Sequence, residues 1–433
     1  NNVSFSPVLA GYRGAVAALG PFAGLWLDSR VRAGKEDAAR LGERFGHYAQ
    51  TRPDGALIWL HGASVGESGV ALQLVDALAA RDPSLSFVLS SGTRTSAELI
   101  AKRAPKRATH IYAPLDRTDA VRRFLAHWRP DLGVFVESEM WPNLILEAQA
   151  AGAPLALVNA RMSPSSLARL ARWPAAAKRL LDAFSLLLAA DRRTADALSM
   201  LIDRSVPCVG NIKLAAPAPP VDETKRALLA NQIGNRHVWL AASTHAGEDE
   251  IVLRAHARLR EHFPDALLII APRHPERGEN IARLADNAPR RSLDQSAEGA
   301  SVYIADTLGE LGLFYSLSSV SFIGGSLLPS LKGHNPVEAA HFDCAILSGP
   351  YVESFSDLYG TLFAASAAAR VTDDDDISGD IGMMWADEEV LRSAMAQGAR
   401  RILAGSANAL NETASRLMTL APAAKLEAAD APA

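Results

Sequence analysis

One strand–turn–helix unit, residues 56–68 (ALIWLHGASVGES), constrains the fold more than any other stretch of this 433-residue chain. Residues 57–60 form an apolar run typical of a buried parallel strand. A short turn follows, and Ser64 then stands where a helix N-cap is expected, with Glu67 three residues further on. Ligands of open α/β sheets bind beyond the carboxyl ends of the strands, so this turn is a candidate site.

Three interpretations of this unit remain open from its own residues. The pattern S-x-x-E, formed by Ser64 and Glu67, is most often a capping box and nothing more. Residues 62–66 also match G-x-S-x-G, the nucleophile elbow of α/β-hydrolases, which would make Ser64 a nucleophile. In the third interpretation, Glu67 is a general base on a helix end that faces a cleft.

Apolar strands alternate with helical stretches along most of the chain, which predicts an α/β fold with mainly parallel sheets. The alternation stops at a proline-containing stretch, 207–220, and then restarts, so we predict two Rossmann-like domains that face a cleft. The predicted segments are 1–45 (membrane-associating), 46–208 (first domain), 209–222 (linker), 223–405 (second domain) and 406–433 (C-terminal helix and tail). Strands are expected at 57–60, 86–90, 132–136, 155–158, 186–190, 238–242, 266–270, 301–304, 319–323 and 344–347.

Composition argues against several classes of function. The net charge of −4 speaks against a nucleic-acid partner, and Cys208 and Cys344 have neither zinc nor disulfide spacing, which suits a reducing, cytosolic setting. A Walker A motif and a G-x-G-x-x-G motif are both absent from the sequence, which leaves P-loop and nicotinamide enzymes unsupported. No ligand spacing predicts a metal site, and the acidic run 373–376 is interpreted as a solvated loop.

The apolar N-terminal stretch, residues 8–27, has two interpretations. It carries Tyr12, Phe22 and Trp26, and Tyr and Trp favour a membrane–water boundary, but Arg13 and Pro21 make it a poor spanning helix. A monotopic anchor or interfacial helix and a plain core helix are therefore about equally favoured.

Two further groups of residues could bind anions. Asn335 can cap a helix with Pro336 and Glu338 at its first and third positions, and glycine-rich stretches before it suggest a phosphate site at the helix N-terminus. Arg273, at a strand end, could pair with a phosphate. The basic stretch 161–179 is either a solvated helical face or a surface for an anionic headgroup or phosphorylated acceptor.

Taken in order, eight motifs resemble those of lipid A Kdo transferases, the 3-deoxy-D-manno-octulosonic acid transferases of lipopolysaccharide synthesis. The resemblance spans about residues 41–359. The motifs are HGASVGE (61–67), ESEMWPN (137–143), NARMS (159–163), GNIK (210–213), ASTH (242–245), APRHPER (271–277), DTLGEL (306–311) and GGS…GHNPVE (324–338).

The resemblance implies an inverting glycosyltransferase of the GT-B type that needs no metal or cofactor. The donor would be CMP-Kdo and the acceptor a tetraacylated, bisphosphorylated lipid A precursor of the lipid IVA type. The enzyme would then work at the cytoplasmic face of the inner membrane, held there peripherally or monotopically, with the first domain taking the acceptor and the second the CMP-sugar.

By the same resemblance, Glu67 would be the general base, and Glu139 and Lys213 would stabilise the transition state. Leaving CMP carries a phosphate, so cations near it would supply charge where it develops. Residues implied in CMP binding are Pro272, Arg273, Gly309, Glu310, Leu311, Asn335, Pro336, Val337 and Glu338; Arg161, Arg169 and Arg172 are the candidates for acceptor binding.

The chain departs from the family pattern in three places. Leu214-Ala215-Ala216 follow GNIK where the family usually continues with Phe-Asp, the loop 91–96 is less rich in Thr, and Lys332 replaces a glycine. Three rival functions are a GT-B enzyme with a UDP-sugar donor, an α/β-hydrolase that uses Ser64, and a non-catalytic membrane-surface binding protein.

Overall fold

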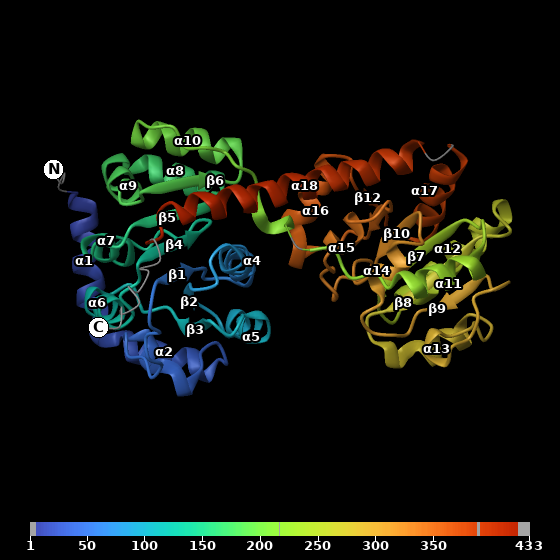
Figure 1. Cartoon of the computed structure of the whole chain (residues 1–433), viewed down its shortest axis with the longest axis horizontal. Helices are drawn as coiled ribbons and strands as arrows, with labels where there is room; N and C mark the ends of the chain where they lie inside the picture. Colours follow the sequence, from blue (N-terminus) through green and yellow to red (C-terminus); the bar gives the residue numbers. More distant parts are fainter. Residues whose placement is uncertain (1–5, 216, 388–389, 423–433) are drawn as a thin grey trace, which may run out of the picture. The chain divides into compact units, whose positions relative to one another are not determined.

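The computed structural model describes residues 6–215, 217–387 and 390–422. It divides into two compact units, Asn1–Ala215 with Gly405–Ala433 (unit 1) and Ala216–Ala404 (unit 2). Figure 1 labels most of the helices and strands of both units. Each unit is described by itself below.

Unit 1 contains a six-stranded sheet in which every neighbouring pair of strands is parallel. Its strand order, β3-β2-β1-β4-β5-β6, is the 3-2-1-4-5-6 order of a dinucleotide-type Rossmann domain. The strands are β1 (Leu57–His61), β2 (Ser86–Ser91), β3 (Ala108–Tyr112), β4 (Leu132–Val136), β5 (Leu155–Ala160) and β6 (Leu186–Ala189). The helices that follow these strands are α4 (Val65–Arg81), α5 (Arg94–Arg103), α6 (Thr118–Trp128), α7 (Pro142–Ala150), α8 (Pro164–Arg172), α9 (Pro174–Leu181) and α10 (Arg192–Ile202).

Unit 2 repeats this arrangement with a second parallel six-stranded sheet, in the order β12-β11-β10-β7-β8-β9. Counted from β7, this is again the order 3-2-1-4-5-6. Its strands are β7 (Val238–Thr244), β8 (Leu267–Pro272), β9 (Val302–Ile304), β10 (Val320–Ile323), β11 (Ala345–Ser348) and β12 (Ala369–Arg370). Its helices are α11 (Glu223–Ile233), α12 (Glu248–His262), α13 (Gly278–Leu284), α14 (Leu311–Tyr315), α15 (Val337–Ala340), α16 (Ser356–Ala364) and α17 (Asp374–Ala386).

These sheets confirm the predicted pair of Rossmann-like domains. Every predicted strand is present, but two strands were not predicted, β3 and β12. The first three residues of β3 are only half-buried at the edge of the sheet, so its apolar signal is short. β12 has two residues. The acidic run was wrongly interpreted as a loop: Asp373 caps α17 and the next three aspartates form its first turn, where the helix dipole favours negative charge.

β1 shows why the apolar run in the sequence is continuous. Leu57 and Trp59 belong to one core cluster, whereas Ile58 and Leu60 belong to another. Because side chains alternate across a strand, these are the two faces of the sheet, and helices cover both. All five residues of β1 are buried.

The C-terminal helix α18 (Val390–Met418) begins in unit 2, but its later residues belong to unit 1. Ala409, Ala414 and Leu417 are fully buried in the same core cluster as Leu60. The described part of 406–433, which the sequence assigns to a segment of its own, therefore completes the core of unit 1.

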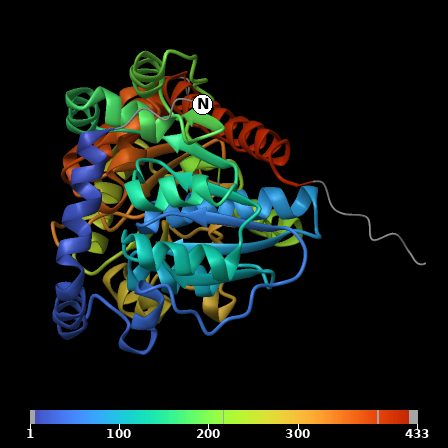
Figure 2. The same ribbon diagram turned by 90° about the vertical axis from the view of Figure 1, so that its left-hand side faces the viewer.

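The N-terminal stretch forms α1 (Pro7–Leu19), a short turn, and α2 (Ala23–Arg32). Figure 2 shows α1 in blue along one side of unit 1. Polar contacts attach it: the Tyr12 hydroxyl donates to Asp116 over 2.7 Å, and Arg13 pairs with Glu147. The stretch Pro7–Arg32 is long and apolar enough to cross a membrane, a test of length and composition that a signal sequence also passes.

Candidate active site at the switch point of unit 1

The strand order of unit 1 reverses between β1 and β4, which lie side by side in the sheet. Glu67 lies in the first turn of the helix after β1, and Glu137 and Glu139 follow β4 directly. In doubly wound sheets, ligands bind in the crevice at such a reversal. The fold therefore brings three carboxylates from two distant parts of the sequence to the position where a Rossmann domain binds its ligand.

Ser64 and Glu67 form a complete capping box. Ser64 Oγ accepts from the Glu67 backbone N–H over 3.3 Å, and Glu67 Oε2 accepts from the Ser64 backbone N–H over 2.8 Å. A side chain at Gly62 would come within 2.9 Å of the Glu67 carbonyl carbon, so the turn needs glycine there. The capping interpretation is confirmed, and it fixes the Glu67 carboxylate at the helix end.

The pKa of the Glu67 carboxyl group is raised above its ordinary value of 4.5. Burial raises its pKa to about 7, and the negative charges of Glu139 and Glu137 act in the same direction, against the lowering effect of the Ser64 hydrogen bonds. A general base works best with a pKa near the operating pH. Capping and base catalysis are therefore compatible roles for this residue.

Glu139 behaves in the opposite way. Burial alone would raise its pKa, but hydrogen bonding from His61 and Trp141 brings it below its ordinary value. Two neighbouring carboxylates with pKa values driven apart are the mark of separate acid–base roles. At neutral pH Glu139 is the ionised member of the pair, and Glu67 is the one able to take up a proton.

His61 is held at the end of β1 by a buried hydrogen-bond chain. Trp59 Nε1 donates to Ser90 Oγ over 2.7 Å, and Ser90 Oγ lies 2.9 Å from His61 Nδ1. A hydroxyl that accepts from the indole can donate its own hydrogen to Nδ1, which favours the tautomer with hydrogen on Nε2. His61 Nε2 lies 3.5 Å from Glu139 Oε2, so this chain orients the imidazole towards the carboxylate.

Lys213 is held by a residue to which the sequence gave no role. Its Nζ lies 2.8 Å from Glu137 Oε1, and Asn159 Nδ2 donates to the same oxygen over 3.4 Å. Asn159 Oδ1 accepts from the backbone N–H of Ile212, next to the lysine. Glu137 and Asn159, which end or follow neighbouring strands, both have left-handed backbone conformations, with φ of 62° and 50°. Such strained non-glycine residues often cluster at functional sites.

Unit 2 has its own reversal, between β7 and β10. The buried Glu248 carboxylate accepts four backbone N–H groups there, from His245, Gly325, Ser326 and Leu327, over 2.7–3.0 Å. It thereby fixes the loops after both strands. A side chain at Gly324 would come within 2.7 Å of a backbone oxygen, so the loop after β10 needs glycine.

Two histidines meet at this second reversal. His245 Nε2 and His334 Nε2 lie 2.8 Å apart, and their rings stack with centroids 5.1 Å apart. Burial is the largest cause that lowers the pKa of His334 to about 4, and burial also lowers the pKa of His245. Both rings are neutral at pH 7, so one donates to the other. Arg273, next to Pro272 at the end of β8, is exposed beside them.

Of the remaining residues implied in CMP binding, several have structural partners. Glu310 pairs with Lys225 and Arg291; hydrogen bonding from Arg291 is the largest cause that lowers its pKa, to about 2. Gly309 has φ of 77°, and Leu311 begins α14. The helix register at Asn335 was predicted wrongly by one residue: α15 begins at Val337, Pro336 is its N-cap, and Asn335 Oδ1 accepts from Val337 N over 3.0 Å. Glu338 is thus the second helical residue; its pKa is raised by burial.

The predicted acceptor arginines differ in their exposure to solvent. Arg169 and Arg172 are exposed on α8, and Arg172 lies over the Trp173 ring, whereas Arg161 is half-buried in the loop before it. None of the three is among the residues that line the pocket beside His61 and Trp141 described below. Their role in acceptor binding stays a prediction.

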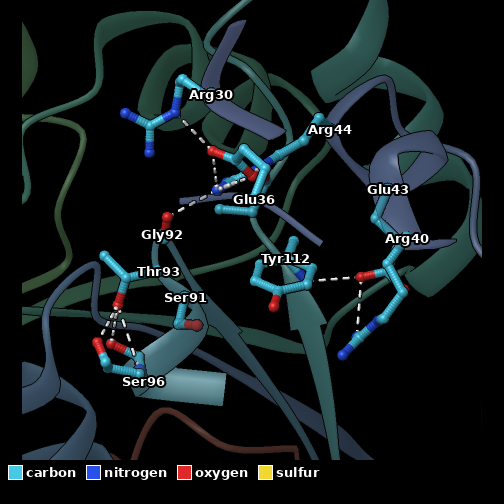
Figure 3. A network of polar contacts seen from close by, with 12 residues as sticks. Arg30, Glu36, Arg40, Glu43, Arg44, Ser91, Gly92, Thr93, Ser96 and Tyr112 are labelled. Atoms are coloured by element: carbon cyan, nitrogen blue, oxygen red, sulfur yellow. Dashed lines mark hydrogen bonds and ion pairs between the residues drawn. The ribbon is translucent and has the colours of Figure 1, made fainter. Parts of the chain in front are cut away.

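A pocket of about 290 Å³ lies beside the carboxylate cluster and is lined by His61, Ala63 and Trp141. Its cationic residues, Arg30 and Arg44, both pair with the buried Glu36 carboxylate. Arg30 Nε donates to Glu36 Oε1 over 2.8 Å, and Arg44 Nε donates to Glu36 Oε2 over 3.0 Å. Figure 3 shows this network, with the terminal nitrogens of Arg30 turned away from Glu36. The sequence did not reveal these arginines because only the fold brings them to the turn after β1.

Figure 3 also shows how the segment before β1 is attached to the sheet. Arg44 donates to the Gly92 carbonyl over 2.7 Å, and the Glu43 carboxylate accepts from the Tyr112 backbone N–H over 2.6 Å. Residues 36–44 were placed by the sequence in a membrane-associating segment. Their buried side chains Glu36, Glu43 and Arg44 instead attach this segment to unit 1. Among the described residues, no group of three or more His, Cys, Asp or Glu side chains is arranged to hold a metal ion.

Two Rossmann-like units of this strand order are the architecture of the GT-B class of glycosyltransferases. A family model described as 3-Deoxy-D-manno-octulosonic-acid transferase (kdotransferase) matches residues 39–216. The 3-deoxy-D-manno-octulosonic acid transferase of Rickettsia bellii is 37% identical over 350 residues, which cover 79% of this chain and 82% of that protein. The protein of the same name from Bordetella pertussis is 32% identical and covers 94% of this chain and 98% of its own. The chain belongs to the Kdo transferase family.

A similarity to solved structures supports the fold alone. The UDP-GlcNAc 2-epimerase from Neisseria meningitidis, bound to UDP-GlcNAc, has a TM-score of 0.52 at 13% identity and covers 84% of this chain and 100% of its own. Family membership leaves the hydrolase interpretation of Ser64 without support, since that residue is the N-cap of a transferase helix.

Proposed function

We propose that this chain transfers Kdo from CMP-Kdo to a lipid A precursor of the lipid IVA type, with inversion of the anomeric centre and without a metal. The family supports a Kdo transfer from a nucleotide-activated donor. The position of Glu67 is the observation that carries the mechanism: it is a fixed carboxylate with a pKa of about 7, at the ligand-binding edge of a Rossmann sheet.

In this mechanism, Glu67 takes the proton of one acceptor hydroxyl as the hydroxyl oxygen attacks the anomeric carbon of Kdo. A bond from oxygen to that carbon forms, the bond from the carbon to the phosphate oxygen breaks, and CMP leaves with the electron pair. A positioned base contributes about 10²–10⁴-fold to such a step.

The neighbouring groups fit the remaining charges. Glu139 stays ionised, and its carboxylate would stabilise positive charge that develops on the sugar ring. Lys213, held by Glu137, would balance negative charge that develops on the departing phosphate. The exposed Arg273 of unit 2 is the candidate phosphate ligand, because its guanidinium fork matches that anion.

We also propose that the protein works at the cytoplasmic face of the inner membrane. Apolar side chains of the N-terminal helices are exposed to an unusual degree, from 52% to 67% at Leu19, Phe22, Leu25 and Trp26. The polar residues Tyr12 and Arg13 attach α1 to unit 1, and Leu9 is buried in its core, but Leu19 at the end of the helix stays exposed. A membrane-bound acceptor would explain why this stretch contacts unit 1 through polar residues and exposes apolar ones.

The decisive experiment incubates the protein with CMP-Kdo and the lipid A precursor, with and without EDTA, and determines the products by mass spectrometry. Addition of one or more Kdo units in both samples is expected. Products only without EDTA would contradict the metal-independent mechanism. A UDP-sugar enzyme would instead be stabilised thermally by UDP and not by CMP; a ligand at 100 times its Kd adds about 2.7 kcal/mol.

A membrane-surface binding protein without catalysis would release no CMP from CMP-Kdo in this assay. It would also bind lipid equally well as the Glu67→Gln variant. Release of CMP by the wild type, lost in Glu67→Gln, is expected.

A further inference from the structure

Unit 1 has a second hollow that the mechanism does not use. It has a volume of about 500 Å³ and lies along the N-terminal helices, lined by Val16, Leu19, Phe22 and Ala23 among others. We call it the apolar trough. The pocket that contains Arg30, Glu36 and Arg44 is called the polar pocket.

The apolar trough and the polar pocket share three wall residues, Trp26, Leu115 and Trp141. Trp141 also donates a hydrogen bond to Glu139 through its indole nitrogen. A ligand that spans both hollows would therefore pass the carboxylate cluster at the point where the two meet. Trp26 also connects the two hollows. It lines both of them, and the Arg30 guanidinium of the polar pocket lies over its ring at 5.0 Å.

The walls of the two hollows differ in polarity. The polar pocket carries two guanidinium groups against one carboxylate, so it favours an anionic ligand group. The apolar trough is lined mainly by aliphatic and aromatic side chains. Its polar residues bind one another within the trough: Tyr12 donates to Asp116, and Arg117 donates to the Gly20 carbonyl over 2.9 Å.

We propose that the apolar trough binds one acyl chain of the acceptor, while the polar pocket holds an anionic group of the same molecule's sugar headgroup. This rests on the proposed function and deepens it by naming the part of the acceptor that the N-terminal helices recognise. The acyl chain then sets how far the sugar hydroxyl reaches towards Glu67. The trough is a specificity site, in addition to any general attraction of these helices to a membrane.

Leu19 and Leu25 provide a matched pair for the test. Their side chains are 66% and 67% exposed on neighbouring helical segments, but only Leu19 lines the trough. Two acceptors are compared, the acylated phosphorylated disaccharide and the same disaccharide without acyl chains. For the acylated acceptor we expect Leu19→Asp to raise KM about tenfold or more, and Leu25→Asp to leave it nearly unchanged. Both variants should bind vesicles of anionic phospholipid equally.

A second variant closes the trough without adding charge. Ala23→Trp should raise KM for the acylated acceptor alone, with kcat for the chain-free acceptor at the wild-type value. Equal effects of Leu19→Asp and Leu25→Asp would overturn the proposal, because the trough would then be one part of a general membrane-facing surface. Equal effects of Ala23→Trp on both acceptors would also overturn it.

Photocrosslinking tests the site without turnover. An acceptor that carries a diazirine on one acyl chain should label residues 16–26 of the wild type, and an excess of the unmodified acylated acceptor should prevent this labelling. Absence of Kdo transfer to either acceptor with labelling retained would contradict the proposed function and leave the trough supported. Kdo transfer with labelling outside residues 16–26 would contradict only the assignment of the trough. Labelling of a second copy of the chain, in place of the copy that binds the acceptor, would do the same.

Discussion

The Lys213 ammonium is fixed by the Glu137 carboxylate, 2.8 Å away, and both residues lie at the edge of the sheet where Glu67 is capped. The ion pair is partly buried, with 18% and 12% of the two side chains exposed. Glu137 therefore has two effects, because it positions the cation and its charge also raises the pKa of Glu67. We regard Glu137 as a positioning residue.

Replacement of Glu137 by Gln should separate these two effects. We expect kcat to fall by up to about 10²-fold, because Lys213 loses its anchor, with little change in KM for either substrate. The acid limb of the pH–rate profile should also move to lower pH, since one charge that raises the pKa of Glu67 is removed. Steady-state kinetics across pH measures both. As a control, Glu412→Gln breaks an exposed ion pair with Arg416 and should change neither quantity.

The activity of the wild type should depend on pH through Glu67. The base must be ionised to accept a proton, and its pKa is raised to about 7, so kcat/KM should fall about tenfold per pH unit below that value. Glu67→Gln should remove nearly all transfer. A rate that stays constant as the pH falls well below 7 would show that another group is the base.

The Glu67→Gln variant should lose activity but gain stability above pH 7. A carboxyl whose folded-state pKa is raised favours folding below its ordinary pKa of 4.5, and this contribution is lost as the pH rises through about 7. The neutral Glu67→Gln protein, whose amide oxygen can still accept from Ser64, should be more stable than wild type above pH 7, by about 1–3 kcal/mol. Thermal unfolding measures this.

Glu139→Gln is the matched control for this measurement. The pKa of Glu139 is lowered in the folded state, so its contribution is present above the ordinary pKa and is lost as the pH falls. That variant should therefore be less stable than wild type at neutral pH. Equal shifts of the two variants in the same direction would contradict the assignment of opposite pKa shifts.

Ser64→Ala tests the hydrolase interpretation directly. Loss of the N-cap hydroxyl should cost about 1 kcal/mol of stability and leave substantial transferase activity. The acid limb should move to higher pH, because the Ser64 hydroxyl lowers the pKa of Glu67. Ser64→Thr retains a capping hydroxyl and should restore stability. Complete loss of activity in Ser64→Ala, with the protein folded, would contradict a purely structural role.

We expect the histidine pair of unit 2 to make binding of the proposed CMP-Kdo donor dependent on pH. His334 has a pKa lowered to about 4, so it is neutral in the free protein. A bound phosphate next to Arg273 would raise that pKa, and CMP binding below neutral pH should therefore take up a proton. Calorimetry in two buffers of different ionisation enthalpy measures the uptake. His334→Gln should abolish it, whereas His237→Gln, at a ring stacked on Trp385, should retain it.

The local parts of this structure could be predicted from the sequence and the non-local parts could not. The N-cap at Ser64 follows from residues three positions apart, and the buried strands follow from continuous apolar runs. The clamp of Glu137, Asn159 and Lys213 depends on two backbone conformations that only the packed sheet imposes. Likewise, Arg30 reaches the polar pocket because Glu36 and Arg44 fasten the segment before β1 to the sheet.

Two departures from the family pattern can likewise be interpreted only with the structure. Lys332, which stands where the family has glycine, has φ of 62°, so it occupies a backbone conformation that glycine adopts without strain. That explains the family's glycine, although the sequence alone gives no backbone angle. Leu214, in place of the usual Phe after GNIK, is buried at 2% exposure and still packs next to Lys213.

The path of α18 has a consequence for the order in which the protein is made. Ala409, Ala414 and Leu417 fill part of the core of unit 1, although they are synthesised after the whole of unit 2. Unit 2 is a continuous piece of chain and can fold as soon as it has emerged. Unit 1, whose synthesis begins first, is thus completed only after unit 2, and until then the part of its apolar core that these three residues cover stays open.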